Sequence, residues 1–496
     1  MSAMMARMMG TSPGISSSPS IASSPPPSSQ SSSLPVRTIP GSYGWPLLGP
    51  ISDRLDYFWF QGPETFFKKR IEKNKSTVFR TNVPPTFPLF LGVNPNVVAV
   101  LDVKSFTHLF DMEIVEKANV LVGDFMPSTK FTGDLRVCAY LDTSESKHTQ
   151  LKNFTIDTLK RSSSIWVPTM VSKLDTMWET IESDISKSGS AAALLPLQQF
   201  LFSFLTKCIT GADTSTSQEI SKSGFTMLDS WIALQVLPTV KVGLFQPLEE
   251  IFLHSFAYPF WLVKGGYNKL VEFVEKQGTE AIQRGETQFN LTAKETVHNL
   301  LFILGFNAFG GFSIFFNSLL SSLADDKNDG IQEKLRNEVR EKIGTDSSKL
   351  SFEVVKEMEL VQSFVYETLR INPPVPLQYA RARKDFKLAS HDSLYEIKKG
   401  ELLCGYQPLV MRDSKVFDNP ENFEPGRFTQ EKGKELLNYL YWSNGPQTGS
   451  PNEANKQCPA KDYVPVTASL FLANMFQRYD SVTISSGSIT AVKKAS

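Results

Sequence analysis

The sequence has no surplus of charge of either sign, and it contains little cysteine or histidine. Its 496 residues include 51 basic and 51 acidic side chains, so the formal net charge is zero. This balance argues against a nucleic-acid partner, which would require a basic surface. The cysteines are widely spaced without a Cys-x-x-Cys pair, at Cys138, Cys208, Cys404 and Cys458. That spacing indicates neither a disulfide framework nor a zinc site.

Acidic residues are missing from the first 52 positions, where Arg7 and Arg37 are the only basic residues. Residues 11–33 are mostly serine and proline, and no apolar segment follows the positive start. This composition is typical of a plastid transit peptide rather than a secretory signal, and a low-complexity tail is the alternative. We therefore expect a transit peptide over residues 1–36, a folded domain over 37–496, and a chloroplast location.

Periodicity predicts a mainly α protein with a small β part. Extended, β-branched sequence at 77–101 predicts a small sheet, and short strands are expected at 385–398. From about residue 145 onward apolar residues recur with the helical period. We expect Ser351 to be the N-cap of the last of these helices. The predicted helices are 149–159, 170–185, 195–210, 269–284, 294–324, 331–343 and 352–370.

Residues 299–324 carry no charged side chain and are long enough to span a membrane. Their asparagines, serines and glycine pair suit a buried functional helix better. We therefore expect no transmembrane span. The segment 252–263, which is dense in apolar and aromatic side chains, favours peripheral membrane contact instead.

One cysteine stands at the end of a loop near the C-terminus. Residues 442–457 are rich in Gly, Pro and Asn, and they lead to Cys458, Pro459 and an apolar run at 464–476. We expect this run to form a helix that Pro459 opens, whose free N–H groups and partial positive charge would stabilise a thiolate. Such a thiolate is a ligand for haem iron. A buried structural cysteine is the alternative.

Upstream motifs place this loop in a known context. Glu367 and Arg370 form a Glu-x-x-Arg on an amphipathic helix, and Arg427 lies in a later Pro-x-Arg-Phe turn. The order of these motifs and the Cys loop resembles the cytochrome P-450 haem-thiolate superfamily. The resemblance implies the cytochrome P-450 fold and a haem b that is bound through Cys458. It also implies a buried ion triad of Glu367, Arg370 and Arg427. Because a buried triad adds little stability, its expected role is to fix the Cys loop.

The chain departs from a monooxygenase of that superfamily. The stretch 305–312 of the central helix lacks the acid and threonine used for proton delivery, and Ala460 replaces a glycine. Trp442 and Cys458 are sixteen positions apart instead of seven, so nine residues are inserted. Four motifs, at 125–128, 306–311, 442–446 and 455–458, are similar to plant allene oxide synthases, hydroperoxide lyases and divinyl ether synthases.

This second resemblance implies a fatty-acid hydroperoxide substrate whose O–O bond is cleaved without O₂, NADPH or a reductase. Asn307 is expected, as a buried amide, to orient the hydroperoxide, with helix packing as its alternative role. Leu121 stands where allene oxide synthases carry Phe, and an aliphatic side chain offers no π face to stabilise a carbon radical. Leu121 therefore favours a hemiacetal and a lyase.

The expected products from 13-hydroperoxides of linoleic and linolenic acid are hexanal or 3-hexenal and 12-oxo-dodecenoic acid. The same resemblance makes four basic residues candidate contacts of the haem propionates, although solvated surface side chains are the alternative. They are Lys117, His148, Lys152 and Lys456. The competing functions are an allene oxide synthase, a reductase-dependent monooxygenase, and a non-enzymatic protein that binds lipid or haem.

Overall fold

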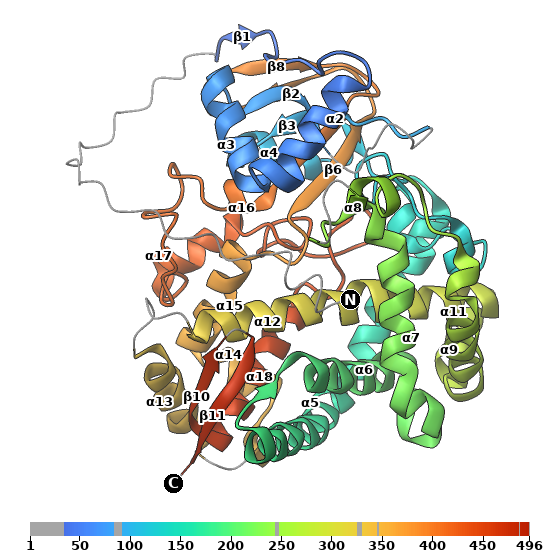
Figure 1. Ribbon diagram of the computed structural model, residues 1–496, viewed down its shortest axis with the longest axis vertical. Helices are drawn as coiled ribbons and strands as arrows, with labels where there is room; N and C mark the ends of the chain where they lie inside the picture. The colour runs from blue at the N-terminus through green and yellow to red at the C-terminus, as the bar shows by residue number, and fades with distance from the viewer. Residues whose placement is uncertain are drawn as a thin grey trace.

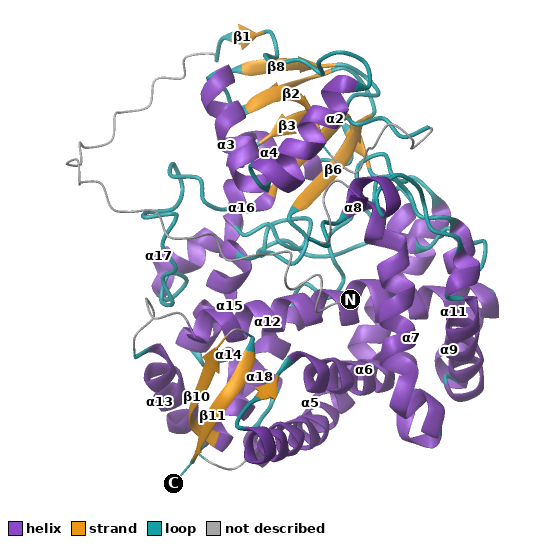
Figure 2. Ribbon diagram, viewed as in Figure 1, coloured by secondary structure: helices purple, strands orange, loops and turns teal. Residues whose placement is uncertain are grey.

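The computed structural model describes residues 34–83, 92–243, 248–324, 330–344, 347–485 and 487–495. A large helical part lies below a smaller part built around sheets (Figure 1), and helices make up far more of the described chain than strands do (Figure 2). The mainly α fold with a small β part is thus confirmed. Of the expected transit peptide, residues 1–33 lie outside the described residues.

The main sheet joins strands from both halves of the chain. Its order is β2–β3–β9–β6–β4, with β2 and β3 antiparallel and Val78 opposite Val100. The predicted sheet at 77–101 is confirmed for its described residues, while 84–91 lie outside them. The strands are β2 (Val78–Asn82), β3 (Asn96–Val100), β4 (Val115–Glu116), β6 (Leu377–Ala382) and β9 (Leu402–Tyr406).

Two smaller sheets complete the β structure. In the first, β1 pairs in parallel with β8, with Val36 opposite Leu394, and β8 pairs with β7. The strands expected at 385–398 are therefore confirmed. The second sheet has the order β10–β11–β5. The bounds are β1 (Val36–Arg37), β5 (Ala191–Ala192), β7 (Phe386–Ala389), β8 (Leu394–Ile397), β10 (Tyr479–Ser485) and β11 (Ser488–Lys494).

The helices fall into a group that packs on the β part and a larger group that forms the main helical body (Figure 1). The first group is α2 (Leu48–Leu55), α3 (Pro63–Asn74), α4 (Val103–Phe106) and α16 (Gln407–Val410). The second is α5 (Ser146–Ser188), α6 (Leu194–Thr210), α7 (Gln218–Val236), α8 (Leu248–Phe252), α9 (Lys264–Gln277), α10 (Thr279–Phe289), α11 (Ala293–Phe302), α12 (Gly310–Ala324), α13 (Ile331–Ile343), α14 (Phe352–Lys356), α15 (Glu359–Ile371), α17 (Gln430–Glu435) and α18 (Tyr463–Arg478).

Short helical turns connect these elements. Two are π-helical, η1 (Asp56–Phe60) and η8 (Ile303–Phe309). The others are 3₁₀ turns: η2 (Thr107–Phe110), η3 (Thr129–Thr132), η4 (Cys138–Tyr140), η5 (Thr214–Thr216), η6 (Leu237–Thr239), η7 (Phe260–Leu262), η10 (Ser347–Lys349) and η11 (Leu436–Tyr439).

Three predicted helix boundaries are wrong. The helices expected at 149–159 and 170–185 are one 43-residue helix, α5, which contains Pro168. The helix expected at 269–284 is divided between α9 and α10 at Gly278. A Cβ there would lie 2.8 Å from the Val274 carbonyl oxygen and 2.9 Å from that of Thr210. The helix expected at 352–370 is likewise divided between α14 and α15, although Ser351 caps α14 by accepting the Val354 N–H at 3.2 Å.

The helix expected at 294–324 is one continuous helical run, α11–η8–α12, that crosses the middle of the molecule (Figure 1). Thr292 and Glu295 form a capping box at its start. By length and composition it could cross a membrane, yet 67% of its most apolar window is buried inside the protein. Gly305 lets it approach α7, because a Cβ there would lie 2.8 Å from both Leu228 and Trp231.

The expected start of the C-terminal helix is also wrong. α18 begins at Tyr463, so Pro459 precedes it and does not open it. A turn in which the Lys461 N–H donates to the Cys458 carbonyl at 3.0 Å separates the cysteine from the helix. Pro465 is the third residue of α18, where the missing N–H has no partner inside the helix anyway.

Candidate active site

The loop that ends in Cys458 is held by its own polar side chains. The Cys458 N–H donates to the Ser443 carbonyl at 2.8 Å. The buried Gln457 amide donates to the Ser443 hydroxyl at 3.1 Å and to the Pro446 carbonyl at 2.6 Å. A Cβ at Gly445 would lie 3.0 Å from the Gln457 side chain, so the loop closes around this glutamine. Sequence reasoning missed Gln457, although it lies within one of the quoted motifs.

Cys458 is half-buried and carries a free thiol. Burial raises its pKa, whereas the Ala460 N–H and the Lys152 ammonium act in the opposite direction. The N-terminus of α18 begins five residues further on and is not the feature that contacts the sulfur. A local N–H and a lysine therefore support a thiolate at this position. The expectation that the N-terminus of the following helix would do so is wrong.

Four basic residues come from three parts of the chain. Lys117 follows β4, His148 and Lys152 lie in the first two turns of α5, and Lys456 precedes Cys458. Burial lowers the pKa of Lys117 to about 7 and that of Lys152 to about 8. Burial, reinforced by Lys456 and Lys152, lowers the pKa of His148 to about 4. These are basic groups whose surroundings disfavour positive charge.

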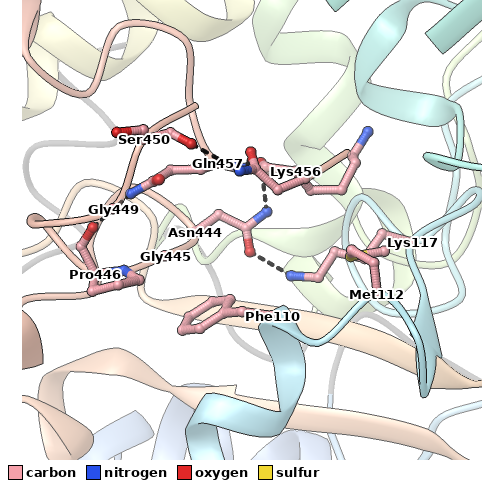
Figure 3. Close-up of a pocket in the computed structure, with 11 residues that line it drawn as sticks. Phe110, Met112, Lys117, Asn444, Gly445, Pro446, Gly449, Ser450, Lys456 and Gln457 are labelled. Carbon is pink, nitrogen blue, oxygen red and sulfur yellow. Dashed lines mark hydrogen bonds between the residues drawn. The ribbon is translucent and has the colours of Figure 1, made fainter. Parts of the chain in front are cut away.

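The hydrogen-bond partners of the three lysines are all neutral. Lys117 donates to the Asn444 amide oxygen, as Figure 3 shows, and Lys152 donates to the Asn455 carbonyl at 3.2 Å. Lys456 donates to the carbonyls of Cys138 and Leu141 at 3.0 and 2.7 Å. Within the described ranges, none of these lysines forms an ion pair with a carboxylate.

Both ring nitrogens of His148 are buried, and within the described residues neither forms a well-aligned hydrogen bond, although the Glu453 backbone is near enough to raise the pKa of the ring slightly. Buried cations and unpaired polar groups are unfavourable unless an anion or acceptor meets them. The donor set therefore fits an anionic group, and the two carboxylates of haem have that chemistry. A cavity of about 190 Å³, lined by Phe110, Lys117, Asn444, Lys456 and Gln457 among others, lies at this place (Figure 3).

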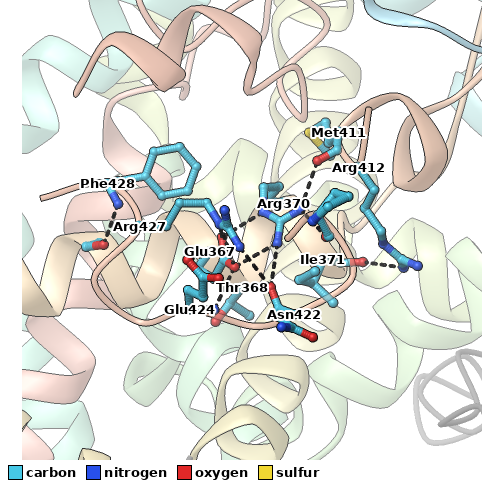
Figure 4. A network of polar contacts seen from close by, with 12 residues as sticks. Glu367, Thr368, Arg370, Ile371, Met411, Arg412, Asn422, Glu424, Arg427 and Phe428 are labelled. Atoms are coloured by element: carbon cyan, nitrogen blue, oxygen red, sulfur yellow. Dashed lines mark hydrogen bonds and ion pairs between the residues drawn. The ribbon is translucent and has the colours of Figure 1, made fainter. Parts of the chain in front are cut away.

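Glu367, Arg370 and Arg427 come together as a buried network (Figure 4). Arg370 donates to both carboxylate oxygens of Glu367 at 2.7 Å, and Arg427 Nε donates to them at 3.1 and 3.2 Å. The remaining guanidinium N–H groups donate to backbone carbonyls, which include those of Met411, Pro420, Asp418 and Asn422. The network thus ties α15 to the segment 411–427 that precedes the Cys loop.

Asn307 lies on the π-helical turn η8, and it is exposed. The expectation of a buried amide is therefore wrong. π-Helical turns inside long helices are frequent at functional sites, and an exposed amide here is open to a ligand. Leu121 is half-buried and packs against the main core from the loop after Lys117.

Sequence reasoning also missed the acids and arginines behind the basic cluster. Asp142 is 2% exposed, and its carboxylate accepts the Lys117 backbone N–H at 3.0 Å. Arg383, which follows β6, donates to Asp142 and, at 2.7 Å, to the Val115 carbonyl. Nothing in the local sequence around Asp142 pairs it with a residue 241 positions away.

Comparison with known proteins gives a consistent result. Residues 136–481 match the family described as Cytochrome P450. The chain is 71% identical over 463 residues to a fatty acid hydroperoxide lyase, chloroplastic, of Solanum lycopersicum, covering 93% of this chain and 97% of that protein. It is 58% identical to a linolenate hydroperoxide lyase, chloroplastic, of Arabidopsis thaliana, covering 98% and 99%.

An allene oxide synthase, chloroplastic, of Linum usitatissimum is 43% identical, covering 95% of this chain and 87% of that protein. All three alignments extend over nearly the whole chain, beyond the family match. The chain therefore belongs to the cytochrome P450 family and, within it, to the group that contains fatty acid hydroperoxide lyases and allene oxide synthases.

Proposed function

We propose that this protein is a fatty acid hydroperoxide lyase. It cleaves the 13-hydroperoxides of linoleic and linolenic acid, via a hemiacetal, to a six-carbon aldehyde and 12-oxo-dodecenoic acid. The observation that carries the proposal is the gap in identity, 71% and 58% to two hydroperoxide lyases against 43% to an allene oxide synthase.

The cofactor is haem b. Cys458 would hold its iron, and Lys117, His148, Lys152 and Lys456 would face its carboxylates, which supply the anion that this cluster lacks. When bound, a haem with a thiolate ligand supplies the chemistry that cleaves an O–O bond homolytically. The triad of Glu367, Arg370 and Arg427 keeps the segment before the Cys loop in place.

The side chains of the central helix suit a substrate that already contains the O–O bond. Asn307 offers an exposed amide that can hydrogen-bond a hydroperoxide oxygen. Residues 305–312 contain no acid or threonine to deliver protons to O₂. The reaction also gains and loses no atoms, because the two carbonyl fragments together have the composition of the hydroperoxide. It therefore needs neither NADPH nor a reductase partner.

Incubation of the purified protein with a 13-hydroperoxide, without NADPH, tests the proposal. Gas chromatography should detect hexanal or 3-hexenal and the twelve-carbon oxo acid as main products. An α-ketol as main product would identify an allene oxide synthase instead. Turnover only with NADPH would indicate a monooxygenase, and no turnover at full haem loading would indicate a non-enzymatic lipid- or haem-binding protein.

Leu121 is the residue that we propose to direct the product. An aromatic ring in its place would stabilise a carbon radical and favour its oxidation. Leu121→Phe should therefore raise the α-ketol fraction at least tenfold at the expense of the aldehyde. Leu121→Met, which keeps an aliphatic side chain of similar volume, serves as the matched control. An unchanged product ratio in Leu121→Phe would remove Leu121 from the mechanism.

We also place the protein in the chloroplast, peripherally bound to a membrane. The two hydroperoxide lyase relatives are named chloroplastic. Two segments, 41–60 and 248–264, carry most of the exposed large apolar side chains of the described residues, among them Trp45 at 80% and Trp261 at 71% exposure. The Arg54–Glu250 ion pair at 2.5 Å joins the two segments.

The charge of these segments suits an anionic lipid surface. Glu249 and Glu250 are buried, and Asp53 and Asp56 pair with Arg70 at 2.6 and 3.4 Å. Every acid of the two segments is therefore covered or paired, whereas Lys264 is exposed beside Trp261. Exposed tryptophans with neighbouring lysines are typical of a surface that enters the headgroup region of a bilayer.

A further inference from the structure

The turn between Arg136 and Glu145, here called the clamp turn, contacts both of the parts that the proposed function needs. It lies before α5 and contains η4. On one side it meets the segment that carries Lys117 and Leu121. On the other side it meets Lys456 of the Cys loop, whose ammonium donates to the Cys138 and Leu141 carbonyls.

Asp142 is the buried centre of the clamp turn. Its carboxylate accepts the Lys117 N–H at 3.0 Å, the Ser144 N–H at 3.0 Å, and the Arg383 guanidinium. Burial alone would raise the pKa of Asp142, but the hydrogen bonds from Ser144, Lys117 and Arg383 outweigh it and hold the pKa well below its usual range. This carboxylate is thus ionised and fixes the backbone position from which the Lys117 side chain extends.

Arg136 makes the first of two connections, to the loop that carries Leu121, and Asp142 makes the second, to Lys117. It donates to both carboxylate oxygens of Glu145, at 2.6 and 3.0 Å, and to the Tyr140 carbonyl at 2.7 Å. Its Nε donates to the Asn119 side-chain oxygen at 3.1 Å. The Asn119 N–H in turn donates to the Tyr140 carbonyl at 3.1 Å.

Asn119 adopts a positive φ of 53°, which asparagine tolerates better than most residues. It lies midway between Lys117 and Leu121, so its two bonds to the clamp turn limit how far the Leu121 loop can move. The clamp turn is itself anchored to the central helix, because the Cys138 N–H donates to the buried Asn299 amide oxygen of α11 at 3.0 Å.

We propose that the clamp turn is a positioning element for the reaction. Arg136 and Asn119 hold the Leu121 loop against the pocket and thereby contribute to product specificity, while Asp142 holds Lys117 for the carboxylates of the cofactor. The proposal rests on the proposed function. None of the three residues needs to touch the substrate, because each acts through Leu121 or Lys117.

Asn119→Gly is the cleanest test of the first connection. Glycine accepts the positive φ without strain, so the variant removes the amide contact and leaves the backbone conformation available. Arg136→Gln removes the same contact from the other side. Both should raise the α-ketol fraction at least threefold over wild type, because a looser Leu121 loop selects less strictly between the fates of the radical.

Arg161→Gln is the matched control. Arg161, like Arg136, is an arginine with a carboxylate partner, Asp157 at 2.9 Å, but it is exposed and lies on α5, away from the clamp turn. The control should keep the wild-type product ratio. The inference is overturned if Asn119→Gly and Arg136→Gln both keep that ratio while Leu121→Phe changes it. Failure of wild type to form aldehyde would refute the proposed function instead.

The second connection is tested by cofactor retention, which does not depend on turnover. Asp142→Asn should speed haem transfer to an excess of apomyoglobin about tenfold, measured by absorbance. In a Lys117→Met background, Asp142→Asn should increase the rate of haem transfer only slightly further. Both substitutions disturb the same contact between Lys117 and the cofactor. Full additivity of the two substitutions, or an unchanged transfer rate in Asp142→Asn, would overturn this part. Arg383→Lys, which keeps the charge, gives a milder variant for the same comparison.

Discussion

Lys117 shows how burial changes what a single side chain can do. It is 4% exposed, its ammonium donates to the amide oxygen of Asn444, and it lies 5.4 Å from the centroid of the Phe110 ring. Burial, with a smaller contribution from Lys456, lowers its pKa to about 7. The ordinary lysine pKa is about 10.4. Without an anion beside it, this lysine therefore gives up its proton far more readily than a lysine in water.

Lys117→Met should stabilise the cofactor-free protein at neutral pH. Between pH 7 and about 10 the unfolded chain binds a proton at this position that the folded chain does not, so stability rises with pH in that window. The substitution should add about 1–3 kcal/mol at pH 7 and flatten this rise. Urea unfolding of the cofactor-free protein at pH 7 and pH 9.5 measures both effects.

Lys130→Met changes an exposed lysine of the same region. It should leave the free energy of unfolding and its change with pH unaltered. In the protein loaded with cofactor, Lys117→Met should lower the free energy of unfolding instead of raising it. The cofactor carboxylates then favour the charged lysine. Equal stability of wild type and Lys117→Met at both pH values would contradict the assignment of a buried ammonium that lacks a carboxylate partner.

Asn307 gives a second prediction at this scale. Replacing it by Leu keeps the side-chain volume and removes the amide, so kcat/KM for a 13-hydroperoxide should fall ten- to a hundredfold. Such a loss corresponds to about 1.4–2.8 kcal/mol of transition-state stabilisation. Asn317→Leu, at a half-buried position of α12, is the matched control and should lose less than threefold. Equal losses in the two variants would indicate a packing role for Asn307.

Among the elements, α15 and the segment 411–427 depend on one carboxylate. Glu367 is completely buried and is the anion shared by Arg370 and Arg427. Glu367→Gln would leave the buried Arg370 guanidinium without a counter-charge, and Arg427 with only the partly exposed Glu424. Breaking a buried ion pair from one side costs about 3–5 kcal/mol. Denaturant unfolding should show a loss of this size.

Glu424→Gln provides the comparison, because Glu424 also pairs with Arg427, at 3.4 Å, but is 41% exposed. An exposed pair of this kind contributes about 0–1 kcal/mol. Similar stabilities for the two variants would show that the triad does not hold these elements together.

The elements also show what the sequence could and could not predict. Periodicity located most of the helical body, and α13 begins and ends where it was expected. The helices expected at 149–159 and 170–185 are instead one continuous helix, α5, which contains Pro168. The division between α9 and α10 depends on backbone contact at Gly278 with Thr210, which is far away in the sequence. The pairing of β3 with β9 depends on similar long-range contacts.

The residues of the candidate site could likewise be predicted only in part from the sequence. Motifs indicated Cys458 and the triad, because each lies in a short recognisable stretch, whereas the four basic residues were candidates only through the family resemblance. The partners Asp142 and Arg383, by contrast, are isolated in sequence and meet only in the fold. The exposure of Asn307 could not be predicted either, since a charge-free stretch indicates burial on average and does not show which residue faces an opening.

At the scale of the whole molecule, most of the exposed large apolar side chains of the described residues lie in two segments. Segments 41–60 and 248–264 lie about 200 positions apart in the chain, and Glu250 joins them through Arg54 and through Trp59, whose indole N–H donates to it at 2.8 Å. Isolated apolar side chains on a surface need no explanation, but a contiguous group of them indicates a binding surface.

Replacing both Trp45 and Trp261 by Ser should weaken binding to vesicles of anionic plastid-type lipids at least tenfold, measured by flotation. Each tryptophan contributes a large apolar area at the interface. Turnover of hydroperoxide in detergent-free buffer should stay within twofold of wild type. Val375→Ser, which removes an exposed apolar side chain outside the two segments, is the control. Undiminished flotation of the double variant would exclude this surface as the membrane contact.

The short strand β1 would limit how far a peptidase could shorten the chain from its N-terminal side. The Leu394 N–H donates to the Pro35 carbonyl at 2.9 Å, and Val36 and Arg37 continue the pairing with β8. A peptidase that cleaved before Leu34 would leave this attachment intact, whereas cleavage beyond Pro35 would require a strand to separate from its sheet. The extent of trimming would thus be limited by the folded domain itself, and heterogeneous cleavage upstream would converge on one resistant end.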